Sequence, residues 1–321
     1  MRWIKKGIIF KPKDHELYNG LNDFAQSPQA LVLKDRVRIY FSIREKDGEK
    51  YLSHIQYVDF DKKLENILGI SKHEVIKLGE LGCFDEHGIF PMNVVKHYDN
   101  VIAFTGGWSR RKSVSIETSI GLAISKNNGE TFSKHCNGPI LTSSLNEPCL
   151  VGDPFVLPQS TKKNPWDMFY IYGLRWIDDG KGNKERVYKI GYAVGFSLHY
   201  WFRSQRQMVE DKLGPNECQA MPTVIRYQNK YHMYFCYREP LDFRINPKCG
   251  YKLGYAYTTN PNSKTNWTRD DSLAGIDVSK DGWDSDMMCY PHLFECDGNI
   301  YMLYNGNKFG KEGFGLAVLE K

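Results

Sequence analysis

The sequence predicts an all-β protein on three observations. The 321 residues include 20 Tyr and 17 Phe, which suit a pleated sheet, and 28 Gly, which suits tight turns. Hydrophobic residues make up 41% of the chain, enough for a large buried core. The third observation is a pattern of strand, turn and strand that recurs along the whole chain.

The recurring pattern is clearest from Glu217 to Arg238. The acidic residue is followed, after four residues, by Pro222, a short β-branched strand, a polar turn at 228–230 and an alternating aromatic strand. Corresponding prolines lie 63, 63, 68 and 69 residues apart, at Pro28, Pro91, Pro154, Pro222 and Pro291. A repeat of this length that fills the chain is typical of a propeller or a solenoid.

Each copy continues with further strands. A third strand containing glycine occurs at 120–123, 190–193, 253–256 and 314–317, with a weaker equivalent at 52–60. A fourth strand opens on an aromatic and a basic residue at 132–134, 201–203 and 267–269. The last copy lacks this strand, and residues 3–10 at the N-terminus have the same form.

Four antiparallel strands in each of five copies predict a five-bladed β-propeller that is closed by the N-terminal strand. Closure removes the exposed strand edges that an open stack of sheets would leave. We therefore expect residues 1–321 to form a single domain, with blades that start near residues 23, 86, 149, 217 and 286.

Composition argues against several kinds of partner. The net charge of +5 is modest and the Lys and Arg residues are scattered, so nucleic acid is not expected as a partner. The N-terminus is charged and no run of eighteen apolar residues occurs, which predicts a cytoplasmic protein without a membrane span. The eight cysteines include no C-x-x-C pair, so reduced thiols are expected rather than disulfides or a zinc site. No metal or cofactor is predicted, and the oligomeric state is left open.

Candidate site residues come first from the segments before the five prolines. The inner strands of a propeller converge on its axis, so these segments should face a central pocket. Each contains an acid: Asp23, Glu86, Asp153, Glu217 and Asp286. The acids either line a carboxylate pocket together or satisfy backbone donors in separate tight turns.

A second set of candidates lies at the end of the next strand. Three copies carry an arginine there, and the last carries an asparagine: Arg44, Arg175, Arg238 and Asn307. The arginines either pair with the pocket carboxylates or bind an anionic part of a carbohydrate, such as a phosphate or a carboxylate. Trp108, Trp176 and Tyr290 either stack on a sugar or pack the propeller, and His87 and His292 flank the same ring.

These residues resemble those of the furanosidase-type five-bladed propeller superfamily, which includes glycoside hydrolase families 32, 43, 62 and 68 and the mannoside phosphorylases of family 130. The resemblance to family 43 implies a general base Asp in the first blade, a positioning Asp in the third and a general acid Glu in the fourth. Gly152-Asp153-Pro154 matches the third-blade motif, and Glu217 ahead of Pro222 matches the acid. The first blade departs from the family, because Ser27 precedes the proline and Asp23 lies four residues earlier.

Two other segments show resemblances. The closing segment from Tyr290 is similar to propeller proteins associated with bacterial surface-polysaccharide synthesis. Residues 125–132 resemble the sialidase Asp-box turn, with Asn127 in place of Asp, and we interpret them as structural.

Three functions remain open from the sequence. In a glycoside hydrolase, Glu217 would be the acid, Asp153 would tune its pKa, and Asp23 would be the base or nucleophile. Glu86 and Asp286 would then bind substrate or replace the base. A phosphorylase or glycosyltransferase would instead use the arginines to hold phosphate or a nucleotide-sugar. A non-catalytic propeller would bind sugar without turnover.

Overall fold

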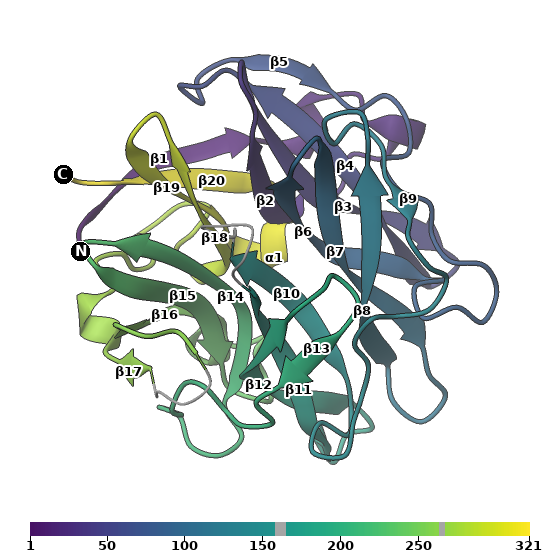
Figure 1. The fold of residues 1–321 in the computed structure, drawn as a ribbon. Coiled ribbons are helices and arrows are strands. Elements are labelled where there is room, and N and C mark those ends of the chain that lie inside the picture. Colours follow the sequence, from purple (N-terminus) through teal and green to yellow (C-terminus); the bar gives the residue numbers. More distant parts are fainter. Residues whose placement is uncertain (158–164, 263–266) are drawn as a thin grey trace.

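Strands make up almost all of the regular secondary structure in the computed structural model, which describes residues 1–157, 165–262 and 267–321 (Figure 1). The all-β, mostly antiparallel class predicted from the sequence is confirmed. The helical elements of the described residues are short: α1 (Asn307–Gly310) and the 3-10 turns η1 (Pro12–Asp14), η2 (Tyr18–Gly20), η3 (Pro247–Cys249) and η4 (Asp271–Leu273). None of these described helices is long and apolar enough to cross a membrane.

The strands fall into groups of four that follow the chain. The first group holds β2 (Gln26–Val32), β3 (Val37–Asp47), β4 (Lys50–Phe60) and β5 (Ile67–Ile70). The second holds β6 (Gly88–His97), β7 (Asn100–Arg110), β8 (Ile116–Ser125) and β9 (Ser133–Lys134). A single parallel pair, Ser53 with Gly88, joins β4 to β6, so these two groups count as one larger sheet.

The next two groups are separate sheets. The third group holds β10 (Val151–Leu157), β11 (Trp166–Asp178), β12 (Lys184–Gly195) and β13 (Trp201–Arg203). The fourth holds β14 (Cys218–Tyr227), β15 (Lys230–Arg238), β16 (Lys252–Thr258) and β17 (Thr268–Arg269). The sequence also predicts a longer polar loop in the third copy, through Pro165, and residues 158–164 of this loop lie outside the described residues.

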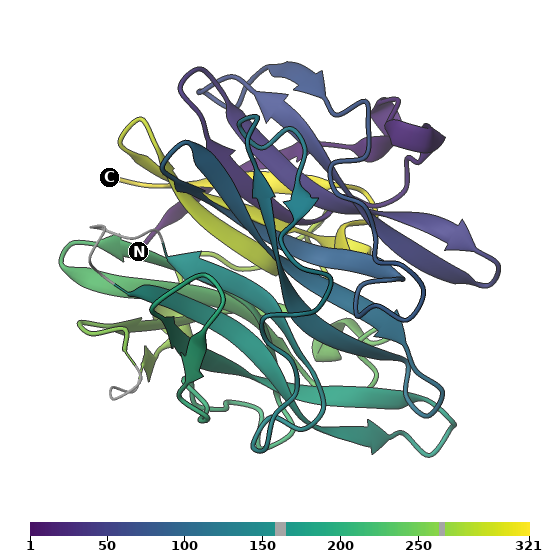
Figure 2. The same ribbon diagram turned by 45° about the vertical axis from the view of Figure 1, so that its right-hand side comes forward.

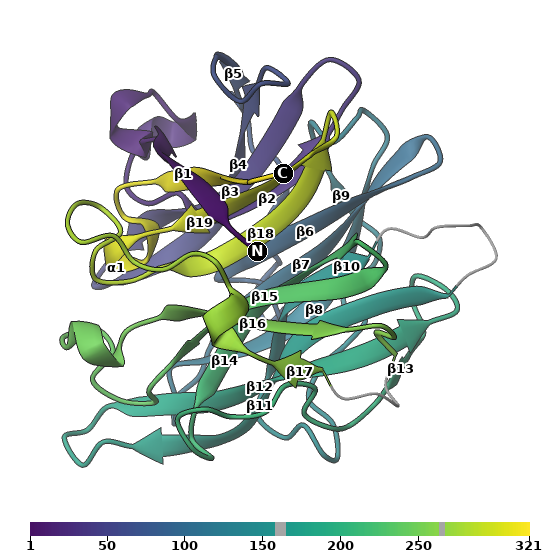
Figure 3. The ribbon, with the colours of Figure 1, turned by 90° about the vertical axis from the view of Figure 1, so that its left-hand side faces the viewer.

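Both ends of the chain form the last group. It holds β18 (Cys289–Cys296), β19 (Asn299–Asn305), β20 (Phe314–Leu319) and β1 (Trp3–Phe10). β1 pairs antiparallel with β20, in a register that runs from Trp3 with Leu319 to Phe10 with Phe314. Figure 3 shows β1 beside the strands that end the chain. The outer edge of this sheet is therefore supplied from the opposite terminus.

The first strand of each group lies toward the middle of the molecule, and the groups are splayed around these strands (Figures 1 and 2). β2 contacts β6, β6 contacts β10, β10 contacts β14, β14 contacts β18, and β18 contacts β2. Asn93 links three of these strands, because its side chain donates to Gln29 at 3.0 Å and accepts from the Val156 N–H at 3.0 Å. On the other side, the Leu293 N–H donates to Thr223 Oγ1 at 2.9 Å.

The proline of each first strand coincides with a bulge. Pairing with the second strand is interrupted at this point in all five groups. In four groups the residue directly before the proline has a positive φ: 55° at Ser27, 47° at Asp153, 51° at Met221 and 56° at Tyr290. Phe90 precedes Pro91 through a cis peptide bond. Because bulges re-aim side chains, these five residues are the ones turned out of the regular ladder.

In four of the groups, a buried carboxylate forms an ion pair that joins the two ends of the group. In each case the acid lies in the segment before the first strand, and its partner is a basic residue of the fourth strand. The pairs are Asp85 with Lys134 at 2.6 Å, Glu147 with Arg203 at 2.5 Å, Glu217 with Arg269 at 2.6 Å, and Asp284 with Lys5 at 2.7 Å. The acids expose at most 3% of their side chains. These pairs explain the basic residue that opens each fourth strand in the sequence.

Removing one partner of such a pair should destabilise the fold. We expect Glu217→Gln to lower the free energy of unfolding by about 3 kcal/mol, because it leaves the buried Arg269 guanidinium without its closest carboxylate. Urea unfolding followed by tryptophan fluorescence measures the change. The matched control is Glu320→Gln, which breaks the exposed pair with Arg2 and should leave the midpoint nearly unchanged. Equal shifts in the two variants would show that the pair across the sheet does not support the fold.

Candidate active site

The five residues before the prolines meet where the first strands of different groups come together. The Met221 N–H donates to Asp153 Oδ2 at 3.2 Å, and Ser27 Oγ donates to Met221 Sδ at 3.7 Å. The rings of Phe90 and Tyr290 lie edge to face with their centroids 5.3 Å apart. Asp153 is the only charged member of this set. The bulges therefore place one carboxyl group among polar, sulfur and aromatic side chains.

Asp153 has the electrostatics of a proton-transfer group. The residue is 9% exposed, and burial raises the pKa of its carboxyl group to about 7. The Met221 N–H and the positive charge of Arg186 oppose this shift by stabilising the carboxylate. Since the pKa lies near neutrality, protonated and ionised Asp153 are both populated under ordinary conditions. A group in this state can either donate or accept a proton.

Three arginines from separate parts of the chain influence one another, and one of them, Arg186, also acts on Asp153. Burial lowers the pKa of Arg44 in β3, and the positive charges of Arg244 and Arg186 lower it further. Arg44 Nε donates to Gln26 Oε1 at 2.7 Å. Glu185 pairs with Arg186 at 3.9 Å and also with Arg244. In the described part of the chain, these three guanidinium groups have one carboxylate at ion-pair distance, so the cluster retains net positive charge.

Aromatic side chains surround the arginines. Arg186 lies on β12 opposite Trp176 of β11, with its guanidinium carbon 6.0 Å from the indole centre and 5.9 Å from the ring centre of Tyr188. The hydroxyl groups of Tyr188 and Tyr251 share a hydrogen bond. The ring of Tyr251 lies 5.8 Å from that of Tyr290, one of the residues at the bulges. Aromatic faces and cations are thus combined in one place, as required to bind a sugar that carries a negative charge.

Arg238, predicted to bind substrate, lies within this aromatic cluster but is 1% exposed. Its guanidinium carbon is 3.5 Å from the ring centre of Phe243, and Nη1 donates to the carbonyl groups of Glu239 and Pro240. Arg238 Nε has no hydrogen-bond partner in the described residues. Arg238 therefore supports the rings of the aromatic cluster, while Arg186 is the arginine whose charge acts on Asp153.

The structure gives Glu217 a different environment from the one expected of a catalytic acid. Its carboxylate is fully buried and is bound by Arg269, by the Lys212 and Leu213 N–H groups at 2.8 and 2.9 Å, and by Gln219 at 3.0 Å. A carboxylate with all of these partners has no free face for a substrate. The geometry therefore favours Asp153 over Glu217 as a proton donor.

The five predicted acids do not share one position in the repeat, which corrects the expectation that they are equivalent. Asp153 lies inside β10, directly before Pro154, whereas Asp23, Glu86, Glu217 and Asp286 lie five residues before their prolines and outside the strands. The bulge turns Asp153 toward the other first strands. The remaining four acids do not lie at a bulge. They belong to the segments that connect the groups.

One of these acids, Glu86, takes part in local contacts. Glu86 Oε1 lies 3.1 Å from His87 Nδ1, and Oε2 accepts from the Gly82 N–H at 2.5 Å. His87 stacks on Trp108 at 5.9 Å, and burial together with the charge of Arg110 lowers the pKa of the imidazole. Asp23 is half-buried before β2. The structure thus keeps Glu86, His87 and Trp108 together as one cluster at the start of β6.

The remaining candidate residues, Asn307, Asp286 and Arg175, lie in contacts that stabilise connecting loops. Asn307 Oδ1 accepts from the N–H groups of Asp286 and Met287 at 2.8 and 3.1 Å, and the Asp286 side chain is exposed. Arg175 is exposed and donates to Asn216 Oδ1 at 2.7 Å. These contacts fix the segments that lead into β18 and β14.

The repeat pattern does not single out Arg186, Arg244, Tyr188 or Tyr251. One signal was present, because the β11 and β12 hairpin is the longest in the described residues and continues its pairing to Asp178 with Lys184. The extension beyond Gly173 is what adds Trp176 and Arg186 to the site. A hairpin that is longer than its equivalents in a repeat therefore indicates where a binding residue has been added.

The fold defines the class of protein first: it is that of the propeller glycosidases and their phosphorylase relatives. The structure superimposes on a glycoside hydrolase with a TM-score of 0.72 at 16% identity, covering 99% of this chain and 91% of that one. A thermostable family-43 glycoside hydrolase gives 0.64 at 13% identity, over 94% and 90% of the two chains. The β-1,2-mannobiose phosphorylase from Listeria innocua gives 0.69 at 12% identity, over 100% and 97%. The fold that the resemblance implied is thus confirmed.

Sequence comparison then places the chain more narrowly. It belongs to the family of the uncharacterized protein Rv1502 from Mycobacterium tuberculosis, with which it shares 31% identity over 326 aligned residues that cover 100% of both chains. The corresponding protein MT1551 of a second strain of that organism gives the same identity and coverage. No protein-family profile matches the chain.

The raised pKa of Asp153 predicts a particular pH dependence of stability. Because the folded state binds this proton more tightly than the unfolded state, wild type should lose stability relative to Asp153→Asn as the pH rises from about 4 to about 7. The slope should approach about 1.4 kcal/mol per pH unit and level off above pH 7. Urea unfolding of both proteins across this range measures the difference. A difference that stays constant with pH would show that burial does not raise the pKa of Asp153.

Proposed function

We propose that this protein is a carbohydrate-active enzyme that cleaves a glycosidic bond, with Asp153 as its proton donor. The observation that carries the proposal is the position of Asp153, a buried carboxyl group with a pKa of about 7 at the bulge where the first strands meet. We further propose that residues 1–321 form one domain, a five-bladed propeller closed by β1. The pairing of β1 with β20 and the contacts between successive first strands support this architecture.

In the proposed reaction, protonated Asp153 gives its proton to the oxygen of the leaving sugar. Loss of that oxygen from the anomeric carbon would otherwise create an alkoxide, so proton transfer lowers the barrier. The reaction leaves Asp153 as a carboxylate near the positive charge of Arg186, which stabilises the ionised form. The aromatic side chains Trp176 and Tyr290 would hold the sugar rings.

Hydrolysis would also require a group that activates water. A second carboxylate across the sugar normally serves as this base. In the described residues, no other carboxylate contributes to the pKa shift of Asp153. If the enzyme is a hydrolase, we propose that Asp23 or Glu86 is the base and that its side chain moves toward the sugar when the sugar binds.

A second candidate function is phosphorolysis or glycosyl transfer, and the three arginines favour it. Phosphate is already an anion and can attack the anomeric carbon without a general base. The positive cluster of Arg44, Arg186 and Arg244 has the charge and the planar donors that bind phosphate. The same cluster would equally bind a carboxylate or phosphate that belongs to the sugar. A non-catalytic sugar-binding propeller remains the third candidate, because Ser27 replaces the expected acid before Pro28.

The direct test is a turnover screen of wild type and Asp153→Asn on oligosaccharides and aryl glycosides, each with and without inorganic phosphate. We expect Asp153→Asn to reduce turnover by about a hundredfold or more while sugar binding persists. Release of a sugar phosphate only when phosphate is present would select phosphorolysis, and release of free sugar in its absence would select hydrolysis. Binding without turnover in wild type would leave a sugar-binding protein.

Glu217→Gln serves as the matched comparison in the same screen. Because the Glu217 carboxylate is enclosed by Arg269 and two backbone N–H groups, we expect this variant to keep its turnover per folded molecule below its own melting temperature. Loss of turnover in folded Glu217→Gln, with activity retained in Asp153→Asn, would return the role of acid to Glu217.

Removing one arginine should weaken the binding of anions. We expect Arg186→Gln to raise the Kd for inorganic phosphate by about tenfold, since a charge-assisted hydrogen bond contributes roughly 1.5–3 kcal/mol. Arg226→Gln is the control, because Arg226 is exposed near the far end of β14. Isothermal titration calorimetry measures both constants. Equal affinities in the two variants would argue against an anion site at Arg186.

A further inference from the structure

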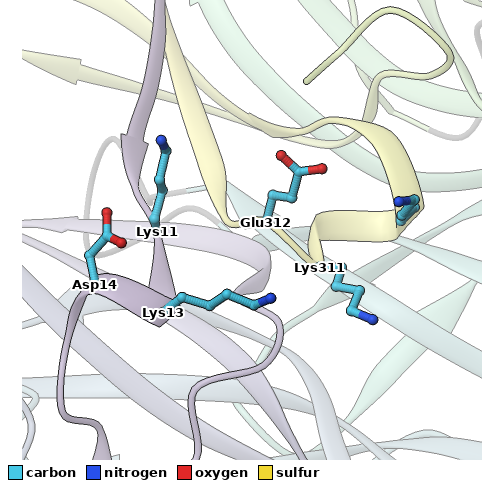
Figure 4. Close-up of a pocket in the computed structure, with 6 residues that line it drawn as sticks. Lys11, Lys13, Asp14, Lys311 and Glu312 are labelled. Atoms are coloured by element: carbon cyan, nitrogen blue, oxygen red, sulfur yellow. The ribbon is translucent and has the colours of Figure 1, made fainter. Parts of the chain in front are cut away.

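A second group of basic residues lies outside the arginine cluster. Lys11, Lys13 and Asp14 follow β1, whereas Lys308, Lys311 and Glu312 lie in and after α1. Together they line a pocket of about 420 Å³, which we call the lysine pocket. Figure 4 shows that the two chain segments face each other across it and that the Lys13 side chain extends toward the side of Lys311.

The lysine pocket has more positive charge than its own residues neutralise. Four lysines and two acids line it. The salt bridges of the described residues include none of these four lysines, and all four are exposed. Four ammonium groups around one small opening repel one another, so an anion that enters the pocket relieves this repulsion. The volume lies within the range of pockets that hold small ligands or single sugar units.

The lysine pocket is connected to the arginine cluster through one loop. The ring of Phe309 packs edge to face against Phe243 and Tyr251, while the neighbouring Lys308 lines the lysine pocket. Gln26 Nε2 donates to the Phe309 carbonyl oxygen at 2.5 Å, and Gln26 Oε1 accepts from Arg44. The α1 loop and the Arg44 side chain are therefore held by the same glutamine.

The backbone of this loop is constrained. Lys308 and Phe309 have φ values of 55° and 59°, in the left-handed region that non-glycine residues seldom adopt. This conformation directs successive side chains to different surroundings, Phe309 to the aromatic cluster and Lys308 to the lysine pocket. The two positively charged sites thus lie on either side of a single turn of the chain.

We propose that the lysine pocket is a second subsite for an anionic glycan, and that the substrate carries negative groups at two separate positions along its chain. The inference rests on the proposed function, because the arginine cluster would hold the first of these groups. Carboxylate and phosphate groups would both satisfy the lysines. A glycan is favoured over a membrane or a nucleic acid because the site is a concave pocket with acids in its lining, whereas those partners bind broad basic surfaces.

The test compares binding of short and long anionic glycans. The probes are galacturonic acid, an octamer of galacturonic acid, a phosphodiester-linked glycan of similar length and neutral dextran. The pocket variant carries Lys11→Gln, Lys13→Gln, Lys308→Gln and Lys311→Gln. The control variant removes the same charge from exposed lysines at the ends of other strands, with Lys34→Gln, Lys96→Gln, Lys126→Gln and Lys230→Gln. Circular dichroism and the melting temperature establish that both variants are folded.

We expect wild type to bind one of the two long anionic glycans about tenfold more tightly than the anionic monomer, since the second contact is made within one molecule. The pocket variant should lose this gain and keep its affinity for the monomer, and the control variant should keep both. Which long glycan shows the gain identifies carboxylate or phosphate as the recognised group.

Other results would overturn the inference in distinguishable ways. If monomer and chain bind equally in wild type, or if pocket and control variants lose affinity equally, the second subsite is excluded while the proposed function stands. If the lysine pocket is instead needed for binding duplex DNA or phosphatidylglycerol vesicles, the glycan assignment fails. If wild type binds none of these glycans but turns over an oligosaccharide or aryl glycoside, the second subsite is excluded while the proposed function stands; if it shows neither binding nor turnover, the proposed function fails as well.

Discussion

In four of the strand groups, a carboxylate that precedes the first strand is bound by a basic side chain of the fourth strand, and the rest of the structure depends on this contact. The two ends of each group are thereby fixed relative to each other. The first group differs, because its buried pair joins neighbouring strands through Arg38 and Asp59. Since a buried charge is costly without its partner, each pair specifies one position for the segment that leads into a first strand. That segment determines where the following bulge lies, and the bulge determines where the site residue points.

Much of this architecture could be predicted, because proline and glycine restrict the backbone locally. The five prolines gave the first strands, and the motif Asp153-Pro154 gave the central carboxyl group. The acids were harder to assign, because two of them lie close together before some first strands. Asp85 is adjacent to Glu86, and Asp284 lies two residues before Asp286. In each of these pairs, the acid that stabilises the sheet is the one buried against the fourth strand. The spacing of residues in the sequence does not show which of the two acids is buried.

The arginines show the same limit of prediction from sequence. Arg44 was predicted from its place in the repeat, whereas Arg186 and Arg244 lie in a hairpin extension and in the segment after β15, which the repeat does not describe. Their approach to Arg44 results from the packing of distant segments. Residues that depart from a repeat can therefore matter more for function than those that follow it, because repeated positions are used mainly to build the sheets.

The pairing of β1 with β20 has a consequence for synthesis of the protein. β1 is translated well before its hydrogen-bonding partner β20, and Lys5 meets Asp284 across 279 positions of the chain. Until β20 has been translated, β1 has no sheet to join, and an unpaired strand edge promotes association with other chains. Pairing of β20 with β1 therefore removes this exposed edge and completes the last sheet.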